Sequence, residues 1–97
     1  MLLKPGVDIW RLERPIRRAL SIIDSVYQDV GEELVITSTY EGGHSPGSLH
    51  YAGLAVDCRL PRTGAVKLCR DLQETLGKDF DVVLEKTHIH VEYDPKK

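Results

Sequence analysis

The sequence predicts a small α+β domain with helices packed on one face of a mainly antiparallel sheet. Two stretches repeat apolar residues at three- and four-residue steps, whereas the other apolar stretches are short and alternate with polar residues. The elements follow the order helix, strand, loop, strand, helix, strand, strand, without internal repeats. With 97 residues, the chain has room for one modest core and a shallow site. We therefore treat residues 1–97 as a single domain.

Both helices have start and stop signals. Pro15 suits the first turn of a helix, and Gly31 is expected to end that helix. Thr63 is expected to cap the second helix, which Gly77 ends. The apolar stripes of the two helices are Ile16, Ala19, Leu20, Ile23, Val26 and Tyr27, and then Ala65, Leu68, Cys69, Leu72 and Leu76.

Four short segments are predicted as strands. Residues 34–38 form a β-branched run, and residues 54–60 alternate so that one face is apolar while the other carries Asp57. Residues 81–84 and 89–93 are separated by a break at Lys86 and Thr87, which predicts a hairpin. The loop from Glu41 to Ser48, rich in Gly and Ser, precedes the second strand.

Composition excludes several classes of partner. Thirteen Lys and Arg against fifteen Asp and Glu give a net charge of −2, which argues against nucleic acid and anionic membranes as partners. No run approaches the roughly 20 apolar residues of a membrane span, and the first residues do not resemble a secretion signal. We therefore expect a monomer that is kept in the cytosol or released by lysis. Cys58 and Cys69 are expected to be buried thiols.

The four histidines lie in two places. His44 and His50 lie in or beside the Gly-rich loop, and His88 and His90 lie on the last strand. Alternation places His88, His90 and Glu92 on one polar face, which by itself is as typical of a solvated strand as of a site. His50 and Asp57 add a third histidine and a carboxylate nearby. Two imidazoles and one carboxylate are the protein ligands of many catalytic zinc sites, where the fourth position stays open.

Two motifs carry a family resemblance. Residues 48–57, Ser-Leu-His-Tyr-Ala-Gly-Leu-Ala-Val-Asp, resemble the Ser-x-His-x-x-Gly-x-Ala-x-Asp signature of the zinc D-Ala-D-Ala carboxypeptidase and L-Ala-D-Glu endopeptidase family. Residues 85–90, Glu-Lys-Thr-His-Ile-His, are similar to its second signature, a late strand with His-x-His and an acidic residue upstream. The resemblance covers about residues 34–93 and implies the fold that this family shares with hedgehog signalling domains.

The resemblance also implies roles for single residues. It makes His50, Asp57 and His90 the ligands of one zinc ion per chain. His88 and Glu85 are the two candidates for the general base that takes a proton from the attacking water. On one regular strand Glu85 and His88 face opposite ways, so Glu85 takes part only if the break at Lys86 and Thr87 reorients it.

One departure from the family concerns substrate binding. In many members an arginine that precedes the loop binds a substrate carboxylate or the reacting carbonyl. Residues 39–44 of this chain, Thr-Tyr-Glu-Gly-Gly-His, contain no arginine. Arg59, Arg62 or His44 are possible substitutes, and Tyr40 and Ser48 are further candidate substrate contacts. The missing arginine favours an endopeptidase over a carboxypeptidase without deciding between them.

The resemblance implies a zinc metallopeptidase that hydrolyses an amide bond in bacterial peptidoglycan peptides, as a phage lysis enzyme of the endolysin kind or a bacterial processing enzyme. The alternative is an inactive zinc-binding or phage structural module on the same fold. A non-haem iron oxygenase uses similar ligands, but its barrel needs more strands than this chain supplies.

Overall fold

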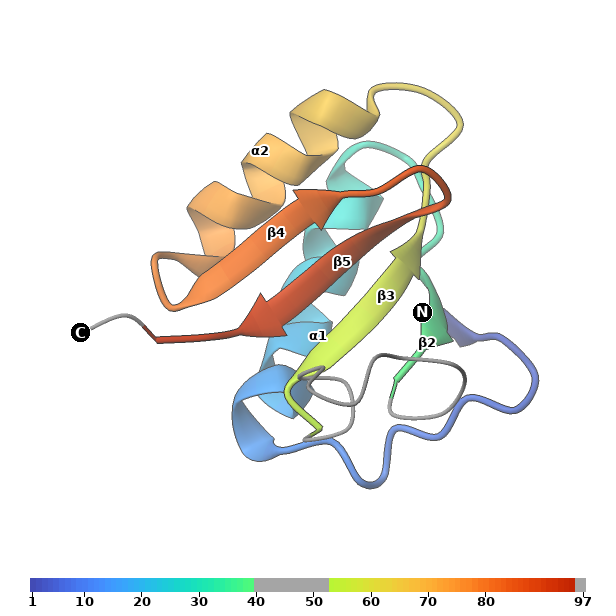
Figure 1. The fold of residues 1–97 in the computed structure, drawn as a ribbon. Helices are drawn as coiled ribbons and strands as arrows, with labels where there is room; N and C mark the ends of the chain where they lie inside the picture. The colour runs from blue at the N-terminus through green and yellow to red at the C-terminus, as the bar shows by residue number, and fades with distance from the viewer. Residues whose placement is uncertain (40–52, 96–97) are drawn as a thin grey trace.

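The structure, a computed structural model, describes residues 1–39 and 53–95. Within these residues two helices accompany a five-stranded mixed sheet (Figure 1). The elements are β1 (Leu2–Leu3), α1 (Arg14–Asp29), β2 (Val35–Ser38), β3 (Ala55–Arg59), α2 (Ala65–Leu76), β4 (Phe80–Leu84) and β5 (His88–Tyr93). The predicted α+β class is confirmed, and every predicted helix and strand is present with ends shifted by one or two residues.

The strand order is β1-β2-β3-β5-β4. Three neighbouring pairs are antiparallel, including the predicted β4–β5 hairpin, but β1 runs parallel to β2. The sheet is therefore mixed, and the expectation of a mainly antiparallel sheet needs this correction. The N–H groups of Leu2 and Lys4 donate to the carbonyls of Leu34 and Ile36, at 2.8 and 2.9 Å. Two apolar residues just before Pro5 are too short a signal to predict this strand from sequence.

Both helices lie on one side of the sheet, behind it in Figure 1. There α2 packs on β4, and α1 packs on α2 and β5. Apolar side chains of the strands meet the helix stripes to form one core, and the opposite, outer face of the sheet carries the polar residues of β3 and β5. The strands contribute Ile36, Val56, Cys58, Ile89 and Val91 to that core.

Several local expectations are corrected by the structure. Residue Gly64, at φ +72°, precedes α2 without a side-chain cap, so Thr63 is not the capping residue. Glycine is suited to this position because it has no Cβ to clash in the left-handed region. Cys58 is fully buried, but Cys69 is only half-buried. Gly31, at φ +73°, follows the end of α1 as expected.

The free edge of β4 is covered by one side chain from α2. Gln73 Nε2 donates to the carbonyl of Phe80 at 2.6 Å, and Gln73 Oε1 accepts from the N–H of Val82 at 3.1 Å. These backbone groups point away from β5, because the alternate residues 81, 83 and 85 face β5 in the antiparallel ladder. The Gln73 carboxamide thus pairs with the edge as a neighbouring strand would, and it limits strand addition there.

A β-bulge changes the face of Ser38. In the β2–β3 pair Ile36 lies opposite Cys58, but Ser38 lies opposite Asp57, so Thr37 is the extra residue. Without the bulge Ser38 would share the core-facing side of Ile36. The bulge instead places Ser38 beside Asp57 on the outer face, where the Thr37 hydroxyl donates to the Asp57 carbonyl at 3.3 Å.

Candidate metal centre

Asp57 is the centre of a polar cluster on the outer face of the sheet. Its side chain projects from the middle of β3, and the residue is only 8% exposed. Its Oδ1 lies 3.1 Å from His90 Nδ1 and 3.5 Å from His88 Nε2, both on the neighbouring strand β5. A carboxylate this buried needs such polar partners, because losing water without replacement costs free energy. The alternation predicted from sequence and the register of β3 with β5 together bring Asp57, His88 and His90 together.

The ring of His90 lies between two carboxylates. Its Nδ1 faces Asp57 Oδ1 at 3.1 Å, and its Nε2 lies 2.7 Å from Glu92 Oε1. The hydrogen bond to Asp57 raises the pKa of His90 above its ordinary value, and the hydrogen bond to Glu92 adds to that rise, although burial opposes it. Both ring nitrogens are thus engaged by groups on the same face of the sheet.

The β4–β5 turn settles the position of Glu85 relative to His88. The Glu85 N–H donates to the His88 carbonyl at 2.9 Å, which makes Lys86 and Thr87 the two turn residues. Glu85 therefore lies opposite His88 across the hairpin, and cross-strand partners share a face. The predicted break does reorient Glu85 in this sense, although Glu85 itself is exposed. Thr87 Oγ1 lies 2.9 Å from His88 Nδ1 and orients that ring.

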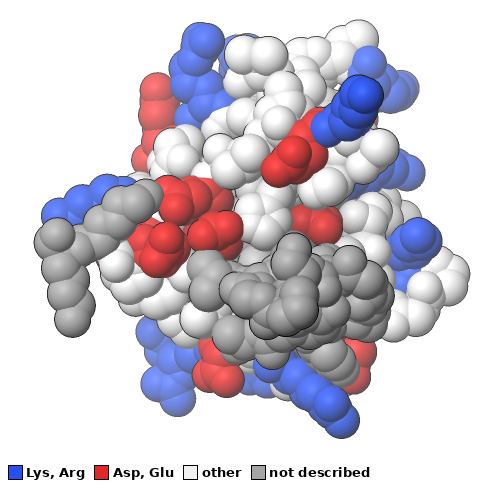
Figure 2. Space-filling view, viewed as in Figure 1, with Lys and Arg blue, Asp and Glu red and all other residues white. Residues whose placement is uncertain are grey.

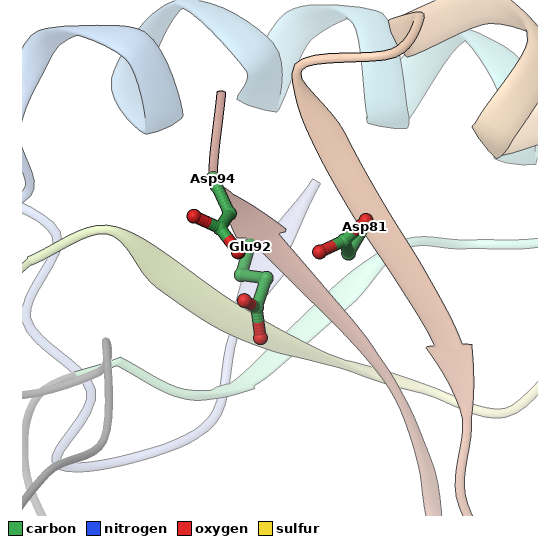
Figure 3. Close-up of side chains that lie close together, drawn as sticks. All are labelled: Asp81, Glu92 and Asp94. Atoms are coloured by element: carbon green, nitrogen blue, oxygen red, sulfur yellow. The ribbon is translucent and has the colours of Figure 1, made fainter. Parts of the chain in front are cut away.

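A group of acidic side chains extends the polar face toward the start of β4 and the end of β5 (Figure 2). Figure 3 shows Asp81 on β4, Glu92 on β5 and Asp94 just beyond the end of β5. One oxygen from each of these three carboxylates lies within 4.8 Å of the others, so the triad can hold one metal ion. Oxygen ligands of this kind suit hard cations such as Ca²⁺ or Mg²⁺.

The predicted site residues fall into two groups. His44, Ser48, Tyr40 and the expected zinc ligand His50 lie outside the described residues. Arg59, at the end of β3, pairs in register with His88, and its exposed side chain lines a hollow of about 570 Å³. Arg62 lines the same hollow, where its Nε bonds Glu32 Oε1 at 3.2 Å. Of the two arginines, Arg59 is therefore the one in register with the Asp57 cluster.

Asp57, His88 and His90 offer donor atoms of the kinds that zinc binds, although among the described residues only the acidic triad places three donors within 4.8 Å of one another. Two ligands that each lie about 2.0–2.1 Å from a tetrahedral zinc ion are roughly 3.3 Å apart. The distances from Asp57 Oδ1 to His90 Nδ1 and to His88 Nε2, 3.1 and 3.5 Å, bracket that value. Asp57 with either histidine would offer two of the three protein ligands that a catalytic zinc site uses, and the 3.1 Å contact is also the hydrogen bond between Asp57 and His90.

Gly53 fastens the start of β3 to the segment before α1. Its carbonyl accepts from the Glu13 N–H at 2.9 Å, and its φ is +74°. A Cβ on this residue would lie 2.9 Å from the Arg11 carbonyl oxygen. The glycine of the first motif is therefore required here both by its backbone conformation and by a close backbone approach.

Comparisons with protein-family models, with curated proteins and with solved structures found no match to this chain. Among the described residues, no helix has the length and apolar character needed to cross a membrane. The support for a function therefore comes from the residues themselves.

Sequence reasoning gave no role to Glu92, Asp81 or Asp94. The signal for Glu92 was its place on the face of His90, two residues along the strand. Asp81 and Asp94 gave no usable signal, because their approach to Glu92 depends on the register of the β4–β5 hairpin.

Proposed function

We propose that this chain is a zinc-dependent peptidase that hydrolyses an amide bond in peptidoglycan peptides. The observation that carries the proposal is the convergence of His88 and His90 on the buried Asp57. These residues come from the two motifs that resemble the peptidase family, and β3 and β5 are neighbours in the sheet. Residues of both motifs thus contact the same atom, Asp57 Oδ1, which supports a shared role.

Asp57 and His90 would hold the metal, together with His50 from the first motif. His90 would bind through Nδ1, because this nitrogen faces Asp57 while Nε2 faces Glu92. When bound, zinc polarises a carbonyl oxygen and acidifies a water molecule. The low exposure of Asp57 strengthens its attraction for a cation, since water screens the charge less there.

His88 is the favoured general base. Its ring lies next to Asp57 and is oriented by Thr87, so its Nε2 is positioned to take a proton at the edge of the cluster. It would later return that proton to the leaving amine. Glu85, opposite His88 across the turn, is the second candidate, and its exposure makes it the weaker one.

The substrate is proposed to lie across the outer face of the sheet. Arg59, whose backbone is in register with His88, is the described arginine of β3 that is proposed to bind a substrate carboxylate. The absence of the usual family arginine favours cleavage inside a peptide over release of a terminal D-Ala. His44, Ser48 and Tyr40 are the proposed contacts from the loop.

The proposal is tested by mass spectrometry of linear and cross-linked muropeptides incubated with zinc-loaded protein, with and without a chelator. Chelator-sensitive cleavage supports the proposal, and the mass lost identifies the bond. His88→Ala is expected to keep stoichiometric zinc and lose rate, whereas Asp57→Ala loses the metal. Asp81→Asn is the matched control, because it removes a carboxylate of the neighbouring acidic triad that has no proposed role as a zinc ligand. Zinc lost from Asp81→Asn but kept by Asp57→Ala would refute the assignment of the site.

A second candidate is an inactive zinc-binding module on the same fold. The missing arginine favours it, whereas the presence of both His88 and Glu85 argues against it. Protein that holds one zinc ion through Asp57 and leaves all muropeptides intact would establish this candidate instead.

A further inference from the structure

We propose that Glu92 is a positioning residue that fixes the His90 ring with its Nδ1 lone pair directed at Asp57. This inference deepens the proposed function and rests on it for the role of the metal. It assigns Glu92 no contact with substrate. The residue acts through His90, which lies two positions earlier on the same face of β5.

The geometry at His90 carries the inference. A neutral imidazole has one N–H and one lone pair, and the two ring nitrogens here face different carboxylates. Nε2 lies 2.7 Å from Glu92 Oε1, whereas Nδ1 lies 3.1 Å from Asp57 Oδ1. The shorter contact favours the proton on Nε2. Nδ1 is then left with the lone pair that a metal ion beside Asp57 requires.

The surroundings of Glu92 hold it in this role. Its side chain is 22% exposed, and its backbone pairs with Ala55 on one side and Asp81 on the other. The Cβ of a paired strand residue cannot move to the other face of the sheet unless the residue leaves the ladder. The sheet therefore fixes the face from which Glu92 projects, and the 2.7 Å contact holds its Oε1 beside Nε2.

Asp94 provides a matched comparison. It belongs to the same acidic triad as Glu92 and carries the same charge, but its only described link to His90 is through that triad. Removing the charge of Asp94 therefore tests a general electrostatic effect, whereas removing Glu92 tests the hydrogen bond as well.

The first experiment measures the His90 tautomer by long-range ¹H–¹⁵N NMR in metal-free protein, at a pH where the ring is neutral. The wild type and Asp94→Asn are expected to carry the proton on Nε2. Glu92→Ala is expected to move it to Nδ1, which then donates to Asp57. Glu92→Gln is expected to restore the Nε2 proton, because its Oε1 still accepts. Glu92→Thr, too short to reach Nε2 but suited to a strand, replaces Glu92→Ala if that variant does not fold.

The second experiment measures zinc affinity by competition with a chelator. Glu92→Ala is expected to lose roughly 10- to 100-fold in affinity, the usual effect of removing a partner of a metal-bound histidine. Asp94→Asn is expected to stay near the wild type. Equal losses in the two variants would overturn the inference, because charge alone would then explain the effect.

The two proposals fail separately. An Nε2 proton that remains in Glu92→Ala overturns the role of Glu92, even if the protein binds zinc and cleaves peptide. A tautomer that switches as expected in protein that binds no zinc supports the role of Glu92 and refutes the peptidase.

Discussion

Gly53 offers the sharpest test of how the first motif is built into the fold. We compare Gly53→Ala with Gly31→Ala, because the two glycines have nearly the same φ, +74° and +73°. A Cβ on Gly31 meets nothing within 4 Å, whereas a Cβ on Gly53 lies 2.9 Å from the Arg11 oxygen and 3.3 Å from the Glu13 nitrogen. The pair separates the cost of the left-handed backbone from the cost of the clash.

The magnitudes follow from these contacts. The left-handed conformation costs an alanine about 1–2 kcal/mol, which is the whole effect expected for Gly31→Ala. At Gly53 the Cβ meets backbone atoms that are unable to swing aside, and overpacking of this kind adds about 1–3 kcal/mol. The shift also strains the hydrogen bond from the Glu13 N–H to the Gly53 carbonyl. We expect Gly53→Ala to lose roughly 2–5 kcal/mol in total.

The assay is urea unfolding followed by far-ultraviolet circular dichroism. Trp10 is 81% exposed and so is a poor fluorescence probe of the core. In a domain of this size, 1 kcal/mol corresponds to about 4–8 °C in Tm, so the two variants are also separable by thermal unfolding. Equal destabilisation of the two variants would refute the reasoning, because it would show that the contact with Arg11 has no energetic consequence.

Three further predictions concern His90, Gln73 and Tyr27. The pKa of folded His90 is raised above 6.5, so His90 stabilises metal-free protein below that pH, and the contribution is lost as the pH rises through the raised pKa. In the presence of chelator, the wild type is expected to exceed His90→Gln in free energy of unfolding at low pH, and this difference is expected to shrink as the pH rises. Gln73→Ala uncovers the β4 edge, so hydrogen exchange at the Val82 amide is expected to accelerate. Tyr27→Phe removes the 2.8 Å hydrogen bond to the Arg59 carbonyl and is expected to cost about 1 kcal/mol in urea unfolding.

Each of these predictions has a control. If the difference in unfolding free energy between the wild type and His90→Gln stays constant from acid to alkaline pH, the raised pKa of His90 is contradicted. Gln28→Ala, a helix glutamine bonded only to Asp24 among the described contacts, should leave Val82 exchange unchanged. Exchange at Val82 that is equal in both glutamine variants would show that Gln73 does not protect the edge. A Tyr27→Phe variant as stable as the wild type would show that the Arg59 carbonyl finds another donor.

The sequence was informative where the signal is local. Both helices follow from their apolar stripes and glycine stops, and the hairpin follows from alternation interrupted at Lys86 and Thr87. Alternation also predicted that Asp57 and His90 face away from the core. These features depend on residues two to four positions apart, so the chain itself encodes them.

The tertiary structure decided what depends on strand pairing. Three features require a register between separate segments of the chain. They are the parallel pairing of β1, the bulge that places Ser38 opposite Asp57, and the position of Glu85 opposite His88. The same holds for Glu92, whose hydrogen bond to His90 is local while its neighbours Asp81 and Ala55 come from two other strands. A shift of one residue in any pair would send these side chains to the opposite face. The sequence therefore determined which polar residues lie on the outer face of the sheet, and the register of the strands determined which of these residues contact one another.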